Sequence, residues 1–322
     1  MLVSQKLKQE FGKNLKFNEP LKNWTTFRIG GSAKYFFIVQ KIEDFVKIIK
    51  VAEKFKIKYF ILGEGSNLLF SDKGFNGLII KNKISNLEIG PVRAGQVKVI
   101  VGAGVKLTYL VMSSIKVGLT GLEWAAGIPG SVGGAIFQNA GAFGSSFAQL
   151  INKVIVFENN KVKKINKKEC FFAYRSSVFQ RNKNIILGVE LRFKKGNKKR
   201  SQERIKQIIN YRRVKQPIQP SAGSVFKNID FKKISKKIVN KYPQLRAFKK
   251  SGIIPAGWLI ENSGLKGKKI GGAQISEKHA NFIINKNRAT AEDVKLLICL
   301  IRGSVLLKFG VKLNKEIEYV KY

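Results

Sequence analysis

The sequence predicts an α+β protein with two or three domains. Its 322 residues suffice for several hydrophobic cores, and 44% of them are apolar, as is usual in globular proteins. Helical and strand-like patterns alternate in the first third, the middle third is rich in strands, and the last strong helical pattern lies near the C-terminus. This change of pattern along the chain indicates separate structural parts.

The first third predicts a helix, a buried strand and further strands. Asp44 opens a helix with one apolar face, and residues 59–62 follow as a short strand. In GEGSNLLFSDKGFNGLII (63–80) a glycine pair follows that strand, as in a dinucleotide-binding loop. Leu68 occupies the third-glycine position, however, and more strand follows instead of a helix. The segment therefore does not predict a Rossmann loop.

The middle third contains the clearest strand patterns. VKVIVGAG (97–104) alternates like a strand and is followed by a helical pattern over residues 108–116. Residues 151–165 predict a hairpin that turns at Asn159-Asn160, and residues 184–193 alternate again. We expect these strands to form one sheet.

The last third begins after a charged run. Ser201 is a suitable N-cap for a helix through about Tyr211 that must end near Pro217, so a domain boundary is expected within residues 200–215. A capping box at Thr290 starts the last helix, which runs towards Gly310. Residues 311–320 then alternate as a terminal strand.

The chain is strongly basic. Lysine and arginine number 61 against 20 acidic residues, a formal net charge of +41 that would attract anionic partners. The excess is mostly lysine spread along the chain, and even the densest runs, residues 194–200 and 232–237, are typical of solvated surfaces. We expect no specific nucleic-acid partner, although a nucleic-acid binder stays an alternative.

Cysteine and histidine are scarce. Cys170 and Cys299 show no CxxC spacing, so we expect two buried thiols and no disulfide. His279 is the only histidine, and we expect it to be structural and the chain to hold no metal. No stretch approaches the roughly 18 apolar residues of a membrane span, so a cytoplasmic chain without a membrane partner is expected.

The stretch GLEWAAGIPGSVGGAIFQNAGAFG (121–144) contains seven glycines. Loops of this kind offer backbone N–H groups to pyrophosphate and let a flat ring lie against the main chain. GEGSN (63–67) is a second, shorter loop of the same type. For GEGSN alone, glycines that only make turns are the better interpretation, but the longer stretch exceeds what turns require. Together they predict a large phosphate-bearing cofactor between two lobes.

Six motifs then occur in order: NWTTFRIGGSAKYF (23–36), LGEGSNLLFSDKGFNGLII (62–80), the stretch 121–144, FFAYRSSVF (171–179), QPIQPSAGSVFKN (216–228) and LIENSGLKGKKIGGAQISEKHANFIIN (259–285). They cover nearly the whole chain. In order and composition they resemble the UDP-N-acetylenolpyruvoylglucosamine reductase (MurB) family, flavoenzymes of peptidoglycan precursor synthesis. Because the gaps between motifs are short, the chain resembles the shorter of the family's two types, without the extra insertion.

The resemblance implies an α+β fold. Its first part is a two-subdomain FAD-binding fold of the vanillyl-alcohol-oxidase (PCMH) type, and its second part is a C-terminal α/β substrate domain. We expect subdomain 1 over residues 1–83, joined by a C-terminal strand at about 306–322, and subdomain 2 over residues 84–200. The substrate-binding domain is expected over residues 201–305.

The resemblance also implies the reaction. NADPH reduces non-covalently bound FAD, and the flavin N5 delivers a hydride to the double bond of UDP-N-acetylglucosamine enolpyruvate, which gives UDP-N-acetylmuramate. The implied partners are therefore the small-molecule substrate and NADPH, and we expect a monomer.

Three catalytic residues follow from the matching motifs. Arg175 of the Y-R-S motif can hold the substrate carboxylate in a planar fork, and Glu316 of the terminal strand can hydrogen-bond the developing enol. Ser224 of the G-S-x-F-K-N motif can protonate the adjacent carbon. From sequence alone Ser224 would be a turn residue and Glu316 a solvent-facing one.

The remaining expected site residues fall in two groups. Those that contact the substrate are Tyr174, Lys215, Lys227 and Asn228, where Lys227 and Arg175 are also candidates to support the Ser224 alkoxide. Those that bind the cofactor come from the two glycine-rich loops: Gly63, Gly65, Ser66, Asn67, Leu68, Gly127, Ile128, Pro129, Gly130, Ser131, Gly133, Gly134, Asn139, Gly141 and Ala142.

An oxidase on the same flavin fold is the second alternative. Such oxidases often hold FAD covalently through a histidine that follows a glycine pair near the N-terminus. In this chain RIGGS places Ser32 at that position, and the only histidine is His279. A non-covalent flavin is therefore favoured.

Overall fold

The computed structural model describes residues 3–182 and 184–321 and divides the chain into two compact units. Unit 1 comprises residues up to Glu19, Ala33–Glu64 and Asn76–Arg212. Unit 2 comprises Pro20–Ser32, Gly65–Phe75 and the chain from Arg213 onward. Two segments from the first quarter of the chain thus belong to the same unit as its C-terminal part.

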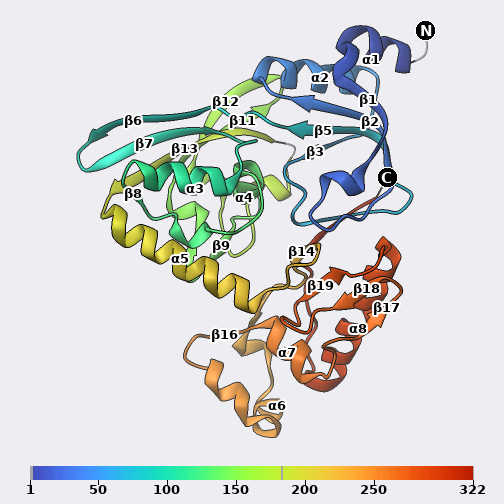
Figure 1. Cartoon of the computed structure of the whole chain (residues 1–322), viewed down its shortest axis with the longest axis vertical. Helices are drawn as coiled ribbons and strands as arrows, with labels where there is room; N and C mark the ends of the chain where they lie inside the picture. The colour runs from blue at the N-terminus through green and yellow to red at the C-terminus, as the bar shows by residue number, and fades with distance from the viewer. Residues whose placement is uncertain (1–2, 183, 322) are drawn as a thin grey trace. The chain divides into compact units, whose positions relative to one another are not determined.

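Unit 1 contains a four-stranded sheet in the order β1-β2-β5-β3, in which β3 and β5 are parallel. Helices α1 and α2 lie over it (Figure 1), and Leu7, Phe45 and Leu78 belong to the core that forms there. The elements are α1 (Val3–Phe11), β1 (Leu15–Pro20), β2 (Ser32–Val39), α2 (Ile42–Lys54), β3 (Tyr59–Leu62) and β5 (Phe75–Asn82).

Unit 1 also contains an antiparallel sheet in the order β12-β11-β13-β7-β6, with β8 paired to β13. This sheet and the helices around it enclose a second core, centred on Val99, Val154 and Leu191. The predicted hairpin at Asn159-Asn160 is confirmed as the turn between β11 and β12. The elements are β6 (Leu87–Arg93), β7 (Gln96–Gly102), α3 (Leu107–Lys116), β8 (Leu119–Thr120), α4 (Val132–Phe137), β9 (Gly141–Ala142), β10 (Ser145–Ser146), β11 (Ile151–Glu158), β12 (Lys161–Asn166) and β13 (Ile185–Lys195).

Helix α5 (Lys198–Lys215) stays with unit 1 over most of its length. Ile205 and Ile208 are buried in the second core, and Ser201 donates a 2.6 Å hydrogen bond to Glu123. The chain therefore passes into unit 2 after Arg212, because the apolar side of the helix packs in the unit 1 core.

Unit 2 contains an antiparallel sheet in the order β14-β19-β18-β17, with helices α7 and α8 packed against it. Phe27, Ile29 and Leu69, all from the N-terminal quarter of the chain, are buried in the same core as Ile283 and Ile301. The elements are β4 (Leu68–Phe70), β14 (Ser221–Ser224), β15 (Ile229–Asp230), α6 (Lys236–Lys241), β16 (Ile253–Ile254), α7 (Ala256–Asn262), β17 (Lys269–Ile270), β18 (Ala273–Ile275), β19 (Phe282–Asn285), α8 (Ala291–Phe309) and β20 (Glu318–Val320).

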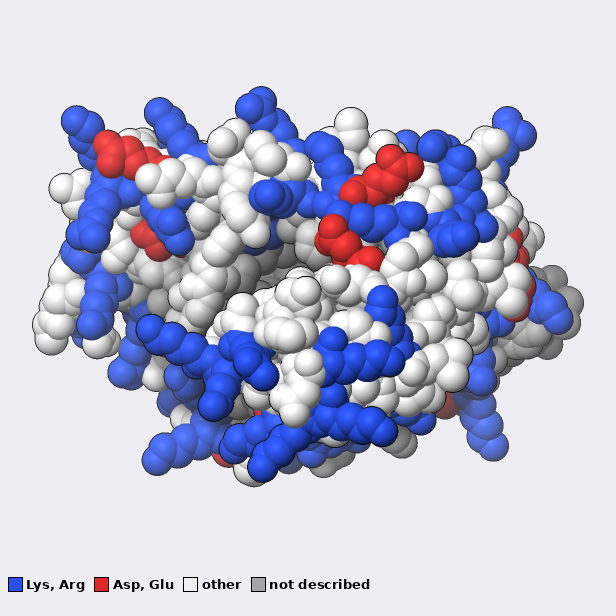
Figure 2. Space-filling model, turned by 90° about the horizontal axis from the view of Figure 1, so that it is seen from below, with Lys and Arg blue, Asp and Glu red and all other residues white. Residues whose placement is uncertain are grey.

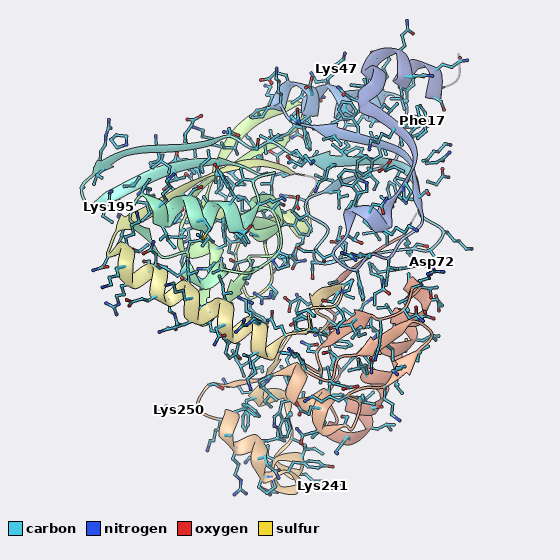
Figure 3. All side chains as sticks on the ribbon, in the orientation of Figure 1. Phe17, Lys47, Asp72, Lys195, Lys241 and Lys250 are labelled. Carbon is cyan, nitrogen blue, oxygen red and sulfur yellow. The ribbon has the colours of Figure 1, made fainter. Side chains whose placement is uncertain are left out.

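Helix α8 is capped twice at its N-terminus. The predicted capping box is confirmed, since Thr290 and Asp293 exchange hydrogen bonds, and Gly310 ends the helix in the left-handed conformation. Asp72, labelled in Figure 3, adds a cap that the sequence did not indicate. Its two carboxylate oxygens accept hydrogen bonds of 2.8 and 3.1 Å from the amides of Ala291 and Glu292.

The expected terminal strand over residues 311–320 is wrong in length. Only Glu318–Val320 forms a strand, β20, which pairs in parallel with β4. Before it, the amide of Glu316 bonds to Val225, and Lys315 forms an isolated bridge with Phe226. Apolar residues alternate with polar ones in this segment because Val311, Leu313 and Ile317 are buried. The backbone of residues 314–316, however, hydrogen-bonds to residues 225–227 and not to β4.

The two thiols differ. Cys170 is buried, as predicted, and burial raises its pKa to about 12. Cys299 is exposed on α8, so the expectation of a second buried thiol is wrong. The apolar pattern of this helix suggested burial of Cys299 because Leu297 and Ile298 beside it are buried, but these two residues lie on a different side of the helix.

Basic residues are spread over the surface. Figure 2 shows lysine and arginine side chains around the outline of the visible face and in several groups within it, with few acidic residues among them. No helix among the described residues combines the length and the hydropathy that a membrane crossing requires.

Candidate functional site

The glycine-rich stretch is docked onto a neighbouring loop of unit 1. Ser131 is the N-cap of α4, and its Oγ accepts a 3.2 Å hydrogen bond from the amide of Gly134. The amides of Val132 and Gly133 donate to the carbonyls of Val105 and Ala103, at 2.9 and 2.8 Å. Part of the expected set of backbone donors is thus used by the fold itself.

Two of the expected cofactor glycines are required by close packing. A Cβ at Gly133 would lie 2.9 Å from the Cβ of Ala103, and one at Gly63 would lie 2.5 Å from the Oγ of Ser131. Gly63 and Ser131 are therefore in contact, which brings the start of the GEGSN loop to the N-cap of α4. The two predicted loops meet within unit 1.

Gly134 is different. A Cβ there would meet only the Oγ of Ser131, at an ordinary contact distance of 3.5 Å, and the residue is exposed. Gly130 has φ of 151°, a conformation that side chains rarely adopt. Exposed backbone without a side chain, as at Gly134, lets a large flat cofactor lie against it, so these residues are compatible with FAD.

A buried lysine fixes the GEGSN loop. The side chain of Lys81 is 4% exposed, and its Nζ donates to the carbonyl of Gly63 at 2.5 Å and to the carboxylate of Glu64 at 2.8 Å. Burial lowers the pKa of Lys81, and the bond to Glu64 opposes that shift. The ammonium group therefore holds the loop at its first two residues.

The second half of this loop lies in unit 2 and is also tightly held. A Cβ at Gly65 would lie 2.2 Å from the carbonyl of Trp24. Asn67 donates from its side-chain Nδ2 to the carbonyl of Glu316 at 3.0 Å, and its backbone carbonyl accepts from the amide of Glu318 at 2.9 Å. Asn67 thus anchors the C-terminal segment, while Ser66 and Leu68 beside it are half-buried.

Asn139 joins the glycine-rich stretch to the Y-R-S turn. Its Nδ2 donates a 2.8 Å hydrogen bond to Ala173, and its Oδ1 accepts one of 3.1 Å from Ala148. The residue is 6% exposed and has φ of 43°. Both halves of its side-chain amide thus bind the protein, which the sequence did not reveal.

The Y-R-S turn is a tight loop of unit 1. Ala173 and Ser176 exchange backbone hydrogen bonds of 3.1 Å, and Arg175 between them has the left-handed φ of 51°. Ser177 donates a 2.7 Å bond to the carbonyl of Phe137 at the end of α4. The turn therefore presents Tyr174 to solvent, with the Arg175 guanidinium 5.4 Å from the centre of the Tyr174 ring.

Arg212 is a residue that the sequence analysis missed. Its Nε donates to Ala126 at 2.9 Å and its Nη2 to Trp124 at 3.2 Å, and burial lowers its pKa. A Cβ at Gly127 would lie 3.1 Å from the Arg212 Cδ. Arg212 therefore fixes the backbone at Trp124 and Ala126, near the N-terminal end of the glycine-rich stretch. The sequence offered one signal for a buried Arg212, its position one helical turn after the apolar Ile208. Its hydrogen-bond partners lie more than 80 residues earlier in the chain.

In unit 2 the backbone brings Ser224 and Glu316 to adjacent segments. Ser224 ends β14 and pairs with Phe282 of β19. The carbonyl of Val225, the next residue, accepts a 2.7 Å hydrogen bond from the amide of Glu316. The amide of Lys227 donates to the carbonyl of Asn314 at 2.9 Å. Ser224 and Glu316 are both half-buried.

The other two predicted substrate residues are placed differently. Asn228 is exposed, and its Oδ1 accepts a 3.2 Å hydrogen bond from the amide of Ala256, the first residue of α7. Lys215 is exposed at the last turn of α5. The backbone thus groups Lys227 with Ser224 and Glu316, while Lys215 lies on a separate element.

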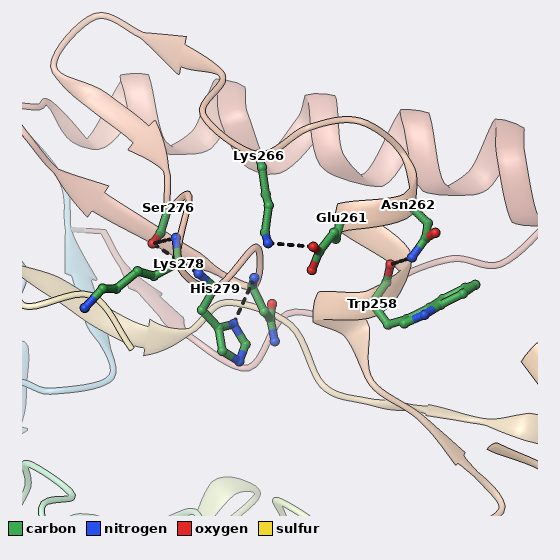
Figure 4. A network of polar contacts seen from close by, with 8 residues as sticks. Trp258, Glu261, Asn262, Lys266, Ser276, Lys278 and His279 are labelled. Atoms are coloured by element: carbon green, nitrogen blue, oxygen red, sulfur yellow. Dashed lines mark hydrogen bonds and ion pairs between the residues drawn. The ribbon is translucent and has the colours of Figure 1, made fainter. Parts of the chain in front are cut away.

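The Ser276–Asn281 loop packs beside the Ser224 segment. Figure 4 shows its polar contacts: Ser276 Oγ accepts from the amides of Lys278 and His279, and Lys266 pairs with Glu261 nearby. Nδ1 of His279 accepts a 3.3 Å bond from the amide of Asn281. Burial lowers the pKa of His279, so its imidazole is neutral near neutral pH, and its ring packs on Phe282.

Comparison with known proteins identifies the family. The family "UDP-N-acetylenolpyruvoylglucosamine reductase, C-terminal domain" matches residues 215–320, and "FAD binding domain" matches residues 33–157. The curated UDP-N-acetylenolpyruvoylglucosamine reductase of Carboxydothermus hydrogenoformans is 41% identical over 97% of this chain and 97% of its own length. The one from Protochlamydia amoebophila is 43% identical over 94% of this chain and 92% of its own length.

A solved structure agrees with these matches. The crystal structure of UDP-N-acetylenolpyruvylglucosamine reductase (MurB) from Thermus caldophilus has a TM-score of 0.75 and 30% identity to this chain. It covers 95% of this chain, and 97% of that chain is covered in return. The predicted α+β class, the FAD-binding fold and the family resemblance are confirmed. The chain belongs to the UDP-N-acetylenolpyruvoylglucosamine reductase family and is an FAD-dependent oxidoreductase.

Proposed function

We propose that this chain reduces UDP-N-acetylglucosamine enolpyruvate to UDP-N-acetylmuramate with NADPH as the electron donor. The observation that carries the proposal is the match to curated reductases over nearly the full length of both proteins. The arrangement of Ser224, Lys227 and Glu316 on adjacent segments supports it, because these are residues to which the family motifs assign substrate chemistry.

The chemistry that FAD supplies when bound is hydride transfer, from NADPH to the flavin and from the flavin N5 to the enolpyruvyl double bond. The backbone at Gly130 and Gly134 would hold the cofactor, and Ser131 orients that backbone through its cap on α4. Lys81 and Arg212 keep the two loops in place through bonds to backbone carbonyls. The binding loops are therefore held in position before the ligand arrives.

Arg175 binds the substrate carboxylate in this proposal. A guanidinium is always charged and presents two parallel N–H groups to a carboxylate. Negative charge develops next to that carboxylate when hydride adds to the far carbon of the double bond. The fixed positive charge of Arg175 stabilises it, and the Glu316 side chain completes the hydrogen bonds around the developing enol.

Ser224 donates the proton to the adjacent carbon. The proton from its hydroxyl and the hydride together saturate the double bond, and the alkoxide left behind regains a proton from solvent. A hydroxyl is a weak acid, so a nearby cation must stabilise the alkoxide. Lys227 is the candidate in unit 2, three residues beyond Ser224 in a backbone held at both positions.

We further propose that the chain acts in the cytoplasm as a monomer, where a UDP-linked sugar and NADPH are available. In this proposal its contribution to the cell wall is the supply of a peptidoglycan precursor. The three-part division into FAD subdomains and a substrate domain stays part of the proposal, and the two separate cores of unit 1 support the split of the FAD-binding part.

The test is a two-step reduction. The purified protein should show the visible absorption of oxidised flavin, lose it on anaerobic addition of NADPH, and regain it on addition of UDP-N-acetylglucosamine enolpyruvate. Acid denaturation should release the flavin into the supernatant. A colourless protein would favour the nucleic-acid binder, and flavin retained in the pellet would favour the covalent oxidase.

A further inference from the structure

We propose that Asn281 is a positioning residue that holds Ser224 in place for proton transfer. The inference rests on the proposed role of Ser224, and Asn281 itself touches neither the substrate nor the cofactor in it. It acts through the backbone of Val225 and Phe226, the two residues that follow Ser224.

Asn281 binds this backbone at three points. Its carbonyl accepts a 2.8 Å hydrogen bond from the amide of Val225. Its Oδ1 accepts a 3.0 Å bond from the amide of Phe226, and its Nδ2 donates a 2.9 Å bond to the carbonyl of Phe226. The side-chain amide thus pairs with both polar groups of one peptide residue, in the way that one strand pairs with another.

The pairing lies where the regular sheet is interrupted. β14 and β19 are in register at Ser221 and again at Ser224, with a register shift between them, and β14 ends at Ser224. Beyond that point the strand ladder no longer holds the chain. Asn281 continues the pairing for two more residues, and it is 4% exposed, so water cannot replace it.

The opposite side of the same backbone holds the Glu316 segment. Val225 accepts the amide of Glu316 at 2.7 Å, and Lys227 donates to Asn314 at 2.9 Å. Val225 and Phe226 therefore lie between Asn281 on one side and the C-terminal segment on the other. A shift of this backbone moves Ser224, which is bonded directly to Val225. Misplacement of a reacting group by about 1 Å can cost about 100-fold in rate.

The central experiment compares Asn281→Ala and Asn281→Asp in the two half-reactions. Asn281→Ala should keep its flavin and its reduction by NADPH, while reoxidation by the substrate slows by about 100-fold. A role in stability alone would lower the melting temperature and leave both half-reactions of the folded protein unchanged. Substrate reoxidation at the wild-type rate in Asn281→Ala would overturn the proposal.

Asn281→Asp adds a rescue. The buried carboxylate can accept from the Phe226 amide but cannot donate to its carbonyl, and burial raises its pKa. At low pH the neutral carboxyl group regains a donor, so reoxidation by this variant should recover as the pH falls. His279, Lys227, Lys315 and Glu316 also lie near this position, but they are common to all the variants. An Asn281→Asp profile parallel to that of Asn281→Ala would overturn the proposal.

Asn285 offers a matched control at the other end of β19. Its Nδ2 donates to the carbonyl of Phe27 at 3.1 Å, and its Oδ1 accepts from the amide of Ala289 at 2.9 Å. Asn285→Ala therefore removes a comparable pair of bonds without touching Val225 or Phe226. We expect a lower melting temperature and normal reoxidation. A loss of reoxidation equal to that of Asn281→Ala would count against a specific role for Asn281.

A double mutant separates this proposal from the proposed function. If Asn281 acts through Ser224, adding Asn281→Ala to Ser224→Ala should slow reoxidation by less than about twofold further. A full additional loss would overturn the inference. Normal reoxidation in Ser224→Ala alone would refute the proton donor itself. As a readout independent of activity, amide hydrogen exchange at Val225 and Phe226 should accelerate in Asn281→Ala, and unchanged protection would also overturn it.

Discussion

Gly133 and Ala103 are packed so closely that a methyl group added to Gly133 would lie 2.9 Å from the Cβ of Ala103. At Gly134, one residue later, an added methyl group would meet only the Oγ of Ser131, at an ordinary contact distance of 3.5 Å. The neighbouring glycines therefore have different reasons to be glycine. The first is required by contacts within the protein, and the second leaves room for a ligand.

Gly134→Val should separate cofactor binding from folding. The protein itself leaves space for the Cβ, so we expect a folded apoprotein that binds FAD poorly, because the branched side chain enters the cofactor's space. Flavin content and the melting temperature of the apoprotein are the measurements. Gly133→Ala is the control and should lower stability through its clash with Ala103. Full flavin occupancy in Gly134→Val would show that the cofactor lies elsewhere.

Arg175→Lys should act on one half-reaction only. Lysine keeps the charge but loses the planar fork, so reduction by NADPH should persist while reoxidation by the substrate falls about tenfold or more. Stopped-flow absorbance of the flavin follows both steps. Arg181→Lys, at an exposed arginine after the same turn, is the control and should behave like the wild type. Normal reoxidation in Arg175→Lys would make Arg175 a structural residue of its turn.

Ser224→Ala should slow the substrate half-reaction by about 10²–10⁴-fold, the usual cost of losing a general acid. Flavin binding and reduction by NADPH should be nearly unchanged. Ser224→Cys should restore part of the rate, because a thiol is the stronger acid. Ser221→Ala, on the same strand, is the control. If Ser224→Ala reoxidises within about threefold of the wild type, another group supplies the proton.

The single histidine predicts a pH dependence of stability. Burial lowers the pKa of His279, so the unfolded chain binds a proton more readily than the folded one. The free energy of unfolding should therefore decrease as the pH falls below about 6.5, the value for an unfolded histidine. Glu261 and Lys266 are the charged groups that act on the ring, Lys266 in the same direction as burial and Glu261 against it.

Urea unfolding between pH 5 and 8 measures this effect. Burial raises the pKa of Glu318, which gives the opposite slope, but Glu318 is the same in wild type and His279→Gln. The difference between the two proteins should change below about pH 6.5 and stay constant above it. Parallel curves throughout would show that the histidine titrates alike in both states.

Much of the fold was predictable because its signals are local. The Asn159-Asn160 turn, strand β3 and the Thr290 capping box each depend on residues within a few positions of one another, and all three are confirmed. The terminal strand was predicted too long because its pattern, too, is only local. Its apolar alternation was real, but the partner of Glu316 is Val225, which no local pattern could indicate.

The supporting residues of the candidate site were harder to predict than its motifs. Arg212 and Asn139 look like ordinary helix and loop residues, and their roles come from bonds to carbonyls 34 to 88 positions away. Asn281 can be recognised as a candidate positioning residue only once the register shift between β14 and β19 is known. The predicted roles of Arg175, Ser224 and Glu316 rest on family motifs, and the half-reaction experiments test them.

The interleaved composition of unit 2 affects how the protein is made. Phe27, Ile29 and Leu69 leave the ribosome early, but the strand that pairs with β4 is Glu318–Val320, close to the end of the chain. Unit 1 has all its segments once residue 212 has been synthesised, whereas β4 of unit 2 lacks its partner until residue 320 has been made. Until then these apolar side chains lack their partners, so the growing polypeptide carries a surface that chaperones recognise. A gene fragment beginning at residue 213 would encode a unit without its N-terminal core residues and without the partner of its last strand.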